Sequence, residues 1–475
     1  MVKRLVPAAA VVAAGALAAP EPAAAHGLVG RADLPIPEWL FGWAAAVVLI
    51  VSFAGLALLW QEPRLEGRKS FRPLPDGLSF TLVNPATEVF AGVVGVGLLA
   101  LTIYAGLAGV QSPQANFAPT FIYVIFWVGL VPLSVLFGDV FRAFNPWRAI
   151  ARGAGWLTAR VRGPLPAPFG YPERLGRWPA AIGLLGFAWM ELAYANGDDP
   201  STLAVAALVY TAITLLAIAC FGTEKWMSRG EAFSVYFNLF SRISAVEVRD
   251  GRLGLRPPLE ALTRLTPVAG TIPLLVVMIG TVAFDGASEG KPWTDVAPDI
   301  QDFFTSLGFS LGTSLELTFT VGMLIGLAIV ASIYLLGIAG VRTVDRRPFG
   351  EIAGSYVHTL VPIAAVYVLA HYFSLLVYNG QAMAYLASDP LGEGSDLFGT
   401  ADATIDYGVL GATAIWYVQV GVLVAGHVCG LVLAHDRALA MYQKARAATT
   451  SQYWMLAVMV AFTTGGLFLL SQANQ

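Results

Sequence analysis

Four ionisable side chains lie inside or at the edge of long apolar runs of the sequence: Glu191, Asp285, Glu316 and His371. Burying such a group in a bilayer costs on the order of 2.5–3.5 kcal/mol on insertion scales, so each is a functional candidate. All four fall near the same ends of their predicted helices and can converge. A carboxylate and an imidazole facing one water-accessible cavity suit a divalent-metal site, a general base or a proton relay.

We therefore predict Glu191, Glu316 and His371 as catalytic residues, with His371 and Glu316 also as metal ligands. The spacing of neighbouring polar residues supports an inward orientation. In the predicted helix over 352–378, four polar residues spaced by four, three and four positions share an arc of about 60°; they are Tyr367, His371, Ser374 and Tyr378. A shorter stripe on the helix over 313–339 contains Thr313, Glu316 and Thr320. The alternative is that these groups only hydrogen-bond neighbouring helices.

A second pair of candidates is His358 and His427, proposed as cofactor-binding residues. Each lies about six residues from one end of its predicted helix, hence roughly 9 Å inside the same edge of the membrane. Histidines on facing helices can ligate haem or another metal. However, Gly426-x-x-x-Gly430 is more simply a close helix contact, so haem is disfavoured. His435 and Asp436 then mark the end of the second helix, where a cation favours the helix dipole.

The elements that position these residues are membrane-spanning helices. The chain of 475 residues is 57% hydrophobic and 12% charged, against roughly 25% charge in soluble domains. Apolar runs of about 20 residues, long enough to cross a ~30 Å hydrocarbon layer, recur throughout. We predict an all-α integral membrane protein with one polytopic domain over 26–475 and spans at about 38–60, 88–110, 118–140, 178–195, 202–221, 266–284, 313–339, 352–378, 407–433 and 452–471.

The N-terminus has the pattern of a secretory signal peptide. Lys3 and Arg4 precede a short Ala-rich apolar stretch and an A-x-A cleavage site at 23–25. Cleavage there would make His26 the first residue of the mature chain. Its free amine and imidazole together suit Cu or Zn, so His26 is a third candidate metal ligand; the simpler interpretation is a flexible end. No metal is otherwise specified by the sequence.

Charge is distributed unevenly between the loops on the two sides. Alternate connections hold 24 of the 28 Lys and Arg residues; they are 61–87, 141–177, 222–265, 340–351 and 434–451. The positive-inside rule places these loops in the cytoplasm of a bacterial cell and both mature termini outside the plasma membrane. The opposite loops 285–312 and 379–406 carry five acidic residues each. Such a face concentrates cations, although solubility alone also explains it.

No soluble domain is expected between the spans. Residues 226–242 place aromatic and aliphatic side chains at helical spacing among Arg, Glu and Ser, which predicts a helix lying in the membrane interface. The ten spans divide into halves of inverted topology, as in several transporters, but no internal repeat supports this. The net charge of −3 gives no argument for nucleic acid.

Several common chemistries have no motif in this sequence. It has no Walker A loop, G-x-S-x-G elbow, H-E-x-x-H helix or C-x-x-C-H haem attachment. Cys220 and Cys429 both lie in apolar runs and form no metal motif. A nucleotide-driven pump on this chain alone is disfavoured.

Several strings resemble a group of polytopic actinobacterial membrane proteins often labelled fenitrothion hydrolase. The strings begin at His26 (HGLVGR), Leu34 (LPIPEWLF), Phe137 (FGDVFRAFNPW), Trp416 (WYVQV), Gly426 (GHVCG) and Ala434 (AHDR). The resemblance implies a membrane-bound hydrolase of phosphotriesters, a reaction that commonly uses a metal to generate hydroxide. It assigns no catalytic residues.

Three functions therefore stay open at this stage. The first is an outward-facing, metal-dependent hydrolase of organophosphate-type esters. The second is a secondary transporter or cation permease, favoured by ten spans and buried carboxylates. The third is an accessory subunit of a larger membrane complex with a membrane-protein partner. The first two act on a small molecule or ion from within the lipid bilayer.

Overall fold

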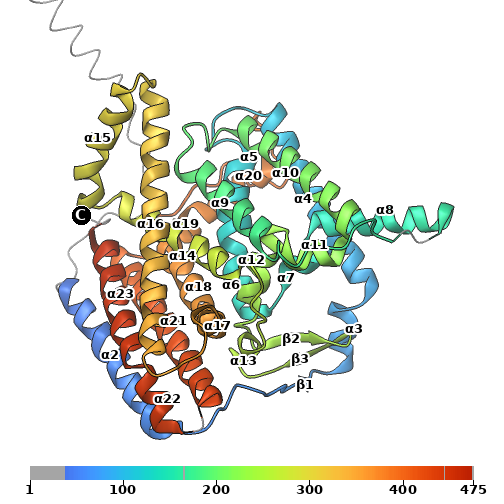
Figure 1. Cartoon of the computed structure of the whole chain (residues 1–475). Helices are drawn as coiled ribbons and strands as arrows, with labels where there is room; N and C mark the ends of the chain where they lie inside the picture. Colours follow the sequence, from blue (N-terminus) through green and yellow to red (C-terminus); the bar gives the residue numbers. More distant parts are fainter. Residues whose placement is uncertain (1–37, 164–165, 443, 473–475) are drawn as a thin grey trace, which may run out of the picture.

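A computed structural model describes residues 38–472, apart from 164–165 and 443; the predicted signal peptide and His26 lie outside the described residues. The described residues are 73% helical, and helices occupy all ten predicted ranges (Figure 1). Of the described helices, eight are long and apolar enough to cross a membrane. This confirms the all-α membrane class, while the count of ten spans stays a prediction.

The bounds of the main helices differ from the predicted ones by up to several residues. They are α2 Glu38–Leu59, α4 Pro85–Ala108, α5 Phe117–Pro119 with η1 Thr120–Gly129 and α6 Leu130–Phe137, α9 Trp178–Leu192, α10 Pro200–Phe221, α14 Thr271–Ser288, α16 Leu311–Arg342, α17 Phe349–Tyr356 with η2 Val357–Thr359 and α18 Leu360–His371, α19 Phe373–Tyr378, α21 Ala412–Met441 and α23 Tyr453–Gln472.

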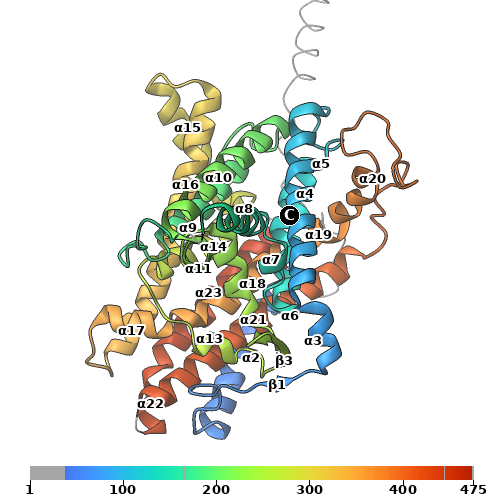
Figure 2. The ribbon, with the colours of Figure 1, turned by 90° about the vertical axis from the view of Figure 1, so that its right-hand side faces the viewer.

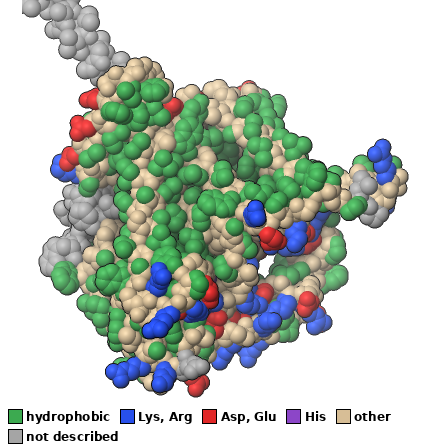
Figure 3. Space-filling view, viewed as in Figure 1, with side chains coloured by type: hydrophobic (Ala, Val, Ile, Leu, Met, Phe, Trp, Pro, Cys, Tyr) green, Lys and Arg blue, Asp and Glu red, His purple; other side chains and the backbone are tan. Residues whose placement is uncertain are grey.

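Burial separates a central helix from peripheral ones. In the span formed by α17, η2 and α18, 83% of the apolar window is buried, against 22% for α10. The helix α18 packs between α14 and α21, whereas α10 packs on α4 and exposes Val209 and Leu216. Exposed apolar side chains cover the flank of the molecule (Figure 3), as expected of surfaces that face lipid.

The two ends of the bundle differ in charge. Helix α15 (Lys291–Ser306) and α20 (Met383–Ser388) lie at one end, which we call the acidic end (Figure 2). The loops rich in Lys and Arg lie toward the other end, which we call the basic end, where α22 (Ala445–Ser451) and a small sheet are found (Figures 1 and 3). This separation follows the predicted loop pattern. The assignment of the basic end to the cytoplasm stays a prediction.

Two loop predictions were wrong. Residues 291–306, expected in a loop, form the amphipathic helix α15, whose Trp293 ring packs 5.2 Å from Phe284 and 5.9 Å from Phe319. Residues 226–242 do not form one interfacial helix. They divide into α11 (Thr223–Arg229) and α12 (Ala232–Ser241), and nine of the ten residues of α12 are buried against α6, α9 and α18. The aromatic spacing fitted both a lipid-facing and a protein-facing helix.

The small antiparallel sheet joins distant loops at the basic end. Its order is β1 (Arg72–Pro73), β3 (Arg252–Leu255) and β2 (Val246–Arg249). Asp250 and Gly251 connect β2 to β3 with φ of 51° and 74°, as a two-residue type I′ hairpin requires. The loop after α2 is therefore tied to the loop between α12 and α14.

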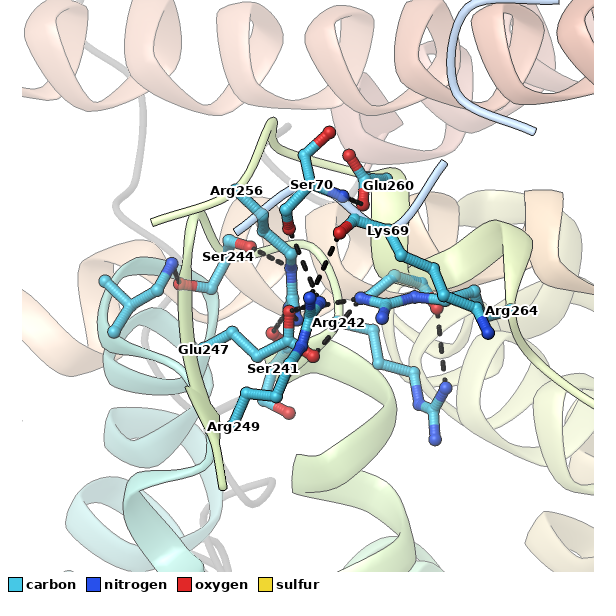
Figure 4. Close-up of polar contacts among 12 residues, drawn as sticks. Lys69, Ser70, Ser241, Arg242, Ser244, Glu247, Arg249, Arg256, Glu260 and Arg264 are labelled. Carbon is cyan, nitrogen blue, oxygen red and sulfur yellow. Dashed lines mark hydrogen bonds and ion pairs between the residues drawn. The ribbon is translucent and has the colours of Figure 1, made fainter. Parts of the chain in front are cut away.

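An ion-pair network supports this sheet (Figure 4). The Glu247 carboxylate lies 2.8 Å from Arg249, 3.1 Å from Arg256 and 3.2 Å from Arg264. Burial raises the pKa of Glu247, but hydrogen bonds and charge from Arg256 and Arg264 outweigh it and leave this pKa lowered. Arg256 also donates to the carbonyls of Ser244 and Ser241. Arg249, Arg256 and Arg264 therefore stabilise the fold of these loops.

Asp345, next to the basic end of α16, predicts an acid-sensitive contact. Hydrogen bonds from the Arg347 side chain lower its pKa from 3.8 to about 2, and Tyr442 also donates to it at 2.9 Å. The stabilisation is present above the unfolded-state pKa and is lost as pH falls from about 4 through about 2. We expect Asp345→Asn to lower the unfolding temperature at pH 6. The unfolding temperature of this variant should then fall less than that of the wild type between pH 4 and pH 2. The same pH dependence of the unfolding temperature for the variant and the wild type, both measured in detergent, would contradict this prediction.

Candidate functional site

His371, Asp285 and Tyr372 form the central contacts of the candidate site. The His371 Nε2 atom lies 2.8 Å from the Asp285 Oδ2 atom, and the Tyr372 hydroxyl donates to the same oxygen at 2.6 Å. Only 9% of the His371 side chain and 14% of the Asp285 side chain are exposed. An ionised carboxylate accepts hydrogen bonds and a phenol donates one. The Asp285 Oδ2 atom can therefore exchange a proton with either His371 or Tyr372.

The local backbone explains how two consecutive residues reach one oxygen. Helix α18 ends at His371, and Tyr372 adopts φ −94° and ψ 15° before α19 begins. This break turns the Tyr372 side chain toward α14. Gly286 lies beside the His371 ring, where a Cβ atom would come 3.4 Å from both Cε1 and Nδ1. The predicted continuous helix over 352–378 is therefore interrupted at Tyr372, near its end, and has a 3-10 segment at Val357–Thr359 near its start.

Glu191 brings a second carboxyl group to the site. It is the penultimate residue of α9, and its carboxyl group interacts electrostatically with that of Asp285. Its Oε2 atom is buried and has no hydrogen-bond partner among the described residues. Two neighbouring acidic groups in a poorly hydrated place are stable only if a proton or a cation neutralises part of their charge.

Aromatic residues that carry buried polar atoms lie near these acids. The indole of Trp127, on η1, lies 5.0 Å from the Tyr372 ring. Its Nε1 atom interacts with the Tyr236 hydroxyl on α12, and neither atom has another hydrogen-bond partner among the described residues. The Ser374 hydroxyl is also buried without a partner there. Tyr236 also lies within electrostatic range of Glu191. Buried polar atoms without a full set of hydrogen bonds are rare in native proteins, so these groups and the Glu191 Oε2 atom mark a polar region among the apolar helices.

Glu316 lies apart from the Asp285 contacts. Its carboxylate accepts from the Ala195 backbone N–H at 3.2 Å, in the loop that follows α9. Thr320, one turn further along α16, accepts from the Trp189 indole at 2.8 Å. In the described part of the chain, Glu316 makes no hydrogen bond or ion pair with His371. The shorter stripe therefore faces α9, while the site is formed by Glu191, Asp285 and His371.

The predicted metal set of His26, His371 and Glu316 stays a prediction, because His26 lies outside the described residues. Among residues 38–472 as described, no group of three or more His, Cys, Asp or Glu side chains is arranged to hold a metal ion. His371 contacts one carboxylate, that of Asp285, which in turn accepts from one phenol, that of Tyr372. This donor set suits a proton better than Zn or Cu, which favour several nitrogen or sulfur ligands.

No hydrogen bond or ring contact joins His358 to His427 among the described residues, and their role as cofactor-binding residues stays a prediction. Gly426 packs against Val366 and Gly430 against Thr359, and the His427 ring lies 6.2 Å from that of Tyr367. His427 therefore lies level with the part of this span between Thr359 and Val366. His427 also bonds the Leu423 carbonyl through Nδ1 at 2.8 Å.

The predicted end of α21 at 433 was wrong. His435 and Asp436 do not end this helix, which continues to Met441. Both side chains are buried, because they bind the loop that follows α2: His435 contacts the Trp60 carbonyl at 2.9 Å, and Asp436 accepts from the indole of Trp60 at 2.9 Å. The predicted depth of His427 was counted from an end at 433, whereas the helix ends eight residues later.

Sequence reasoning named Asp285 among the converging groups but not as the partner of His371, and it missed Tyr372, Tyr236 and Trp127. A polar stripe shows which face of a helix carries the polar residues, but it does not show which other helix packs against that face. Tyr372 falls outside the stripe of His371 and reaches Asp285 only through the break between α18 and α19. Searches against protein families, characterised proteins and solved structures give no match to this chain.

Proposed function

We propose that this multi-pass membrane protein is a secondary transporter that exchanges protons for a monovalent cation at Glu191 and Asp285. The observation that carries the proposal is the pair of interacting carboxyl groups, one with a buried oxygen lacking a partner in the described chain. A proton and an alkali cation neutralise a carboxylate equally well. Competition between them at one site that opens to one side of the membrane at a time gives coupled exchange.

The neighbouring groups suit proton delivery. Asp285 is in contact with both His371 and Tyr372, which can donate or accept a proton at the same oxygen. An imidazole can both accept and donate a proton through its ring nitrogens, so His371 can pass a proton between Asp285 and water at the acidic end. The nearby acidic loops raise the local concentration of cations. In this mechanism the proton leaves Asp285 before the cation binds, and the cation leaves when a proton returns.

Ion flux into proteoliposomes tests the exchange with several cations in parallel. Vesicles with an acidic interior and a pH-sensitive dye are diluted into Li⁺, Na⁺, K⁺ or choline solution. We expect one or more alkali cations, and not choline, to release the proton gradient faster than in empty vesicles. Equal rates with every cation and with empty vesicles would reject the proposal.

A second candidate function is the phosphotriester hydrolysis implied by the resemblance. The contact that favours it is His371 held by Asp285 at 2.8 Å, because a carboxylate that orients an imidazole is the arrangement of a general base. Purified protein supplied with Zn²⁺ or Cu²⁺ and fenitrothion would then release a nitrophenol product, and His371→Gln would abolish the release. Hydrolysis without ion exchange would select this candidate over transport.

A further inference from the structure

We propose that an apolar cavity between α4, η1, α9 and α10 binds the acyl chain of a membrane lipid. The cavity has a volume of about 730 Å³, within the range of small-molecule pockets. Helices α4, α9 and α10 lie together on one side of the bundle (Figure 1). This inference does not depend on the proposed ion exchange.

The walls indicate an occupant without polar groups. Aromatic and aliphatic side chains form most of the lining, including Phe121, Phe126, Phe187 and Phe233. Three of the four polar lining residues, all but Thr202, use their polar atoms within the protein. Thr102 donates to the Leu98 carbonyl, Trp147 donates to Thr211, and Tyr210 donates to Glu231. Recognition therefore depends on apolar contact and shape, as for a hydrocarbon chain.

The dimensions of the cavity match one leaflet. Lining residues of α10 run from Thr202 to Ile213, and eleven steps of 1.5 Å give a length of about 17 Å. Half of the ~30 Å hydrocarbon layer is about 15 Å. An acyl chain that lies along α10 thus fits the cavity in the orientation that it has in the bilayer.

The cavity also has a route from the lipid. Val205, Val209 and Ile213 line it, and each is more than half exposed on the lipid-facing surface. A chain can therefore enter sideways from the membrane without crossing a polar layer. This contact with the bilayer identifies a lipid, rather than a water-soluble ligand, as the source of the occupant.

Local sequence keeps the space open. Gly186 of α9 lines the cavity, and a Cβ atom built there would meet nothing within 4 Å. Opposite it, η1 is a π-helix of ten residues, a geometry frequent at functional sites. η1 turns Phe126 to the cavity and carries Trp127 toward Tyr372. The bound chain and the candidate site thus share one wall.

Photo-cross-linking tests the proposal. The protein is reconstituted with phosphatidylglycerol that carries a diazirine in the middle of one acyl chain, and labelled peptides are mapped by mass spectrometry. We expect labelling near Phe126 and Met190, and at least tenfold less of it in Gly186→Leu. Gly97→Leu is the matched control, because Gly97 is exposed on α4, does not line the cavity and also has free space.

The outcomes separate binding in the cavity from general contact with lipid. Labelling of Phe126 and Met190 that persists in Gly186→Leu overturns the proposal, as does labelling no stronger than at exposed Phe90. Ala206→Phe, which fills the same cavity from α10, provides a second variant if Gly186→Leu does not fold. Extraction of the purified protein then identifies the source: a diacyl lipid or free fatty acid supports the proposal, and an isoprenoid alone refutes it.

Discussion

Asp436→Ala is expected to lower the free energy of unfolding by about 3–5 kcal/mol, at the upper end for single substitutions. The Asp436 side chain is buried and accepts from the backbone N–H groups of Arg64 at 2.5 Å, Leu65 at 3.0 Å and Glu66 at 2.7 Å, as well as from the Trp60 indole. Alanine leaves all four donors without their acceptor. Each unsatisfied buried donor costs about 1–3 kcal/mol, reduced where water reaches it.

Unfolding by sodium dodecyl sulfate, followed by circular dichroism, measures this change. Asp299→Ala is the control, because Asp299 is exposed on α15 and has no comparable contacts in the described structure. We expect the control to change the free energy by less than about 0.5 kcal/mol. A loss below about 1 kcal/mol for Asp436→Ala would show that the loop after α2 does not depend on this carboxylate.

The helices were predictable because a bilayer imposes a simple requirement. A segment that crosses it needs about 20 apolar residues, and this condition can be read from composition alone. The ends of the helices were harder to predict from the sequence. Polar His435 and Asp436 predicted an end for α21, whereas their contacts with the residues that follow α2 carry the helix on to Met441. Such contacts join positions about 370 residues apart and have no local signal.

The small sheet shows a signal that was present and not used. The sequence around Asp250-Gly251 alternates apolar and polar residues on both sides of an Asp-Gly pair, the strongest short-range indication of a hairpin. High overall hydrophobicity favoured helices everywhere and obscured this feature. The strand pairing itself, with Val246 opposite Leu255, follows directly from the two-residue turn.

The candidate site was predictable in its chemistry and not in its partners. The cost of burying charge singled out Glu191 and His371. Their neighbours depend on which helices pack together, and Glu316 was included because its helix has a similar stripe. In the structure α16 directs that stripe to Trp189 and the loop after α9, whereas α14 and α18 bring Asp285 to His371. Periodicity defines the face of a helix, and packing decides which face it meets.

Asp285→Asn is expected to abolish proton–cation exchange in proteoliposomes. Asparagine keeps the shape of the side chain and an oxygen for the Tyr372 hydroxyl, but it cannot carry the transferred proton or the charge that binds a cation. Removing a group that transfers a proton commonly slows a reaction by roughly 10²–10⁴-fold. We therefore expect flux to fall at least about tenfold, to the level of empty vesicles.

The control makes the same chemical change outside the site. Asp250→Asn lies in the exposed hairpin turn at the basic end, where asparagine suits the turn as well as aspartate. It is expected to retain normal flux and a normal unfolding temperature. Tyr372→Phe removes one donor to Asp285 while leaving its carboxylate, so it should shift the pH dependence of exchange without abolishing it. If Asp285→Asn folds normally and still exchanges at the normal rate, the transferred proton does not pass through this carboxylate, and the assignment of the site is wrong.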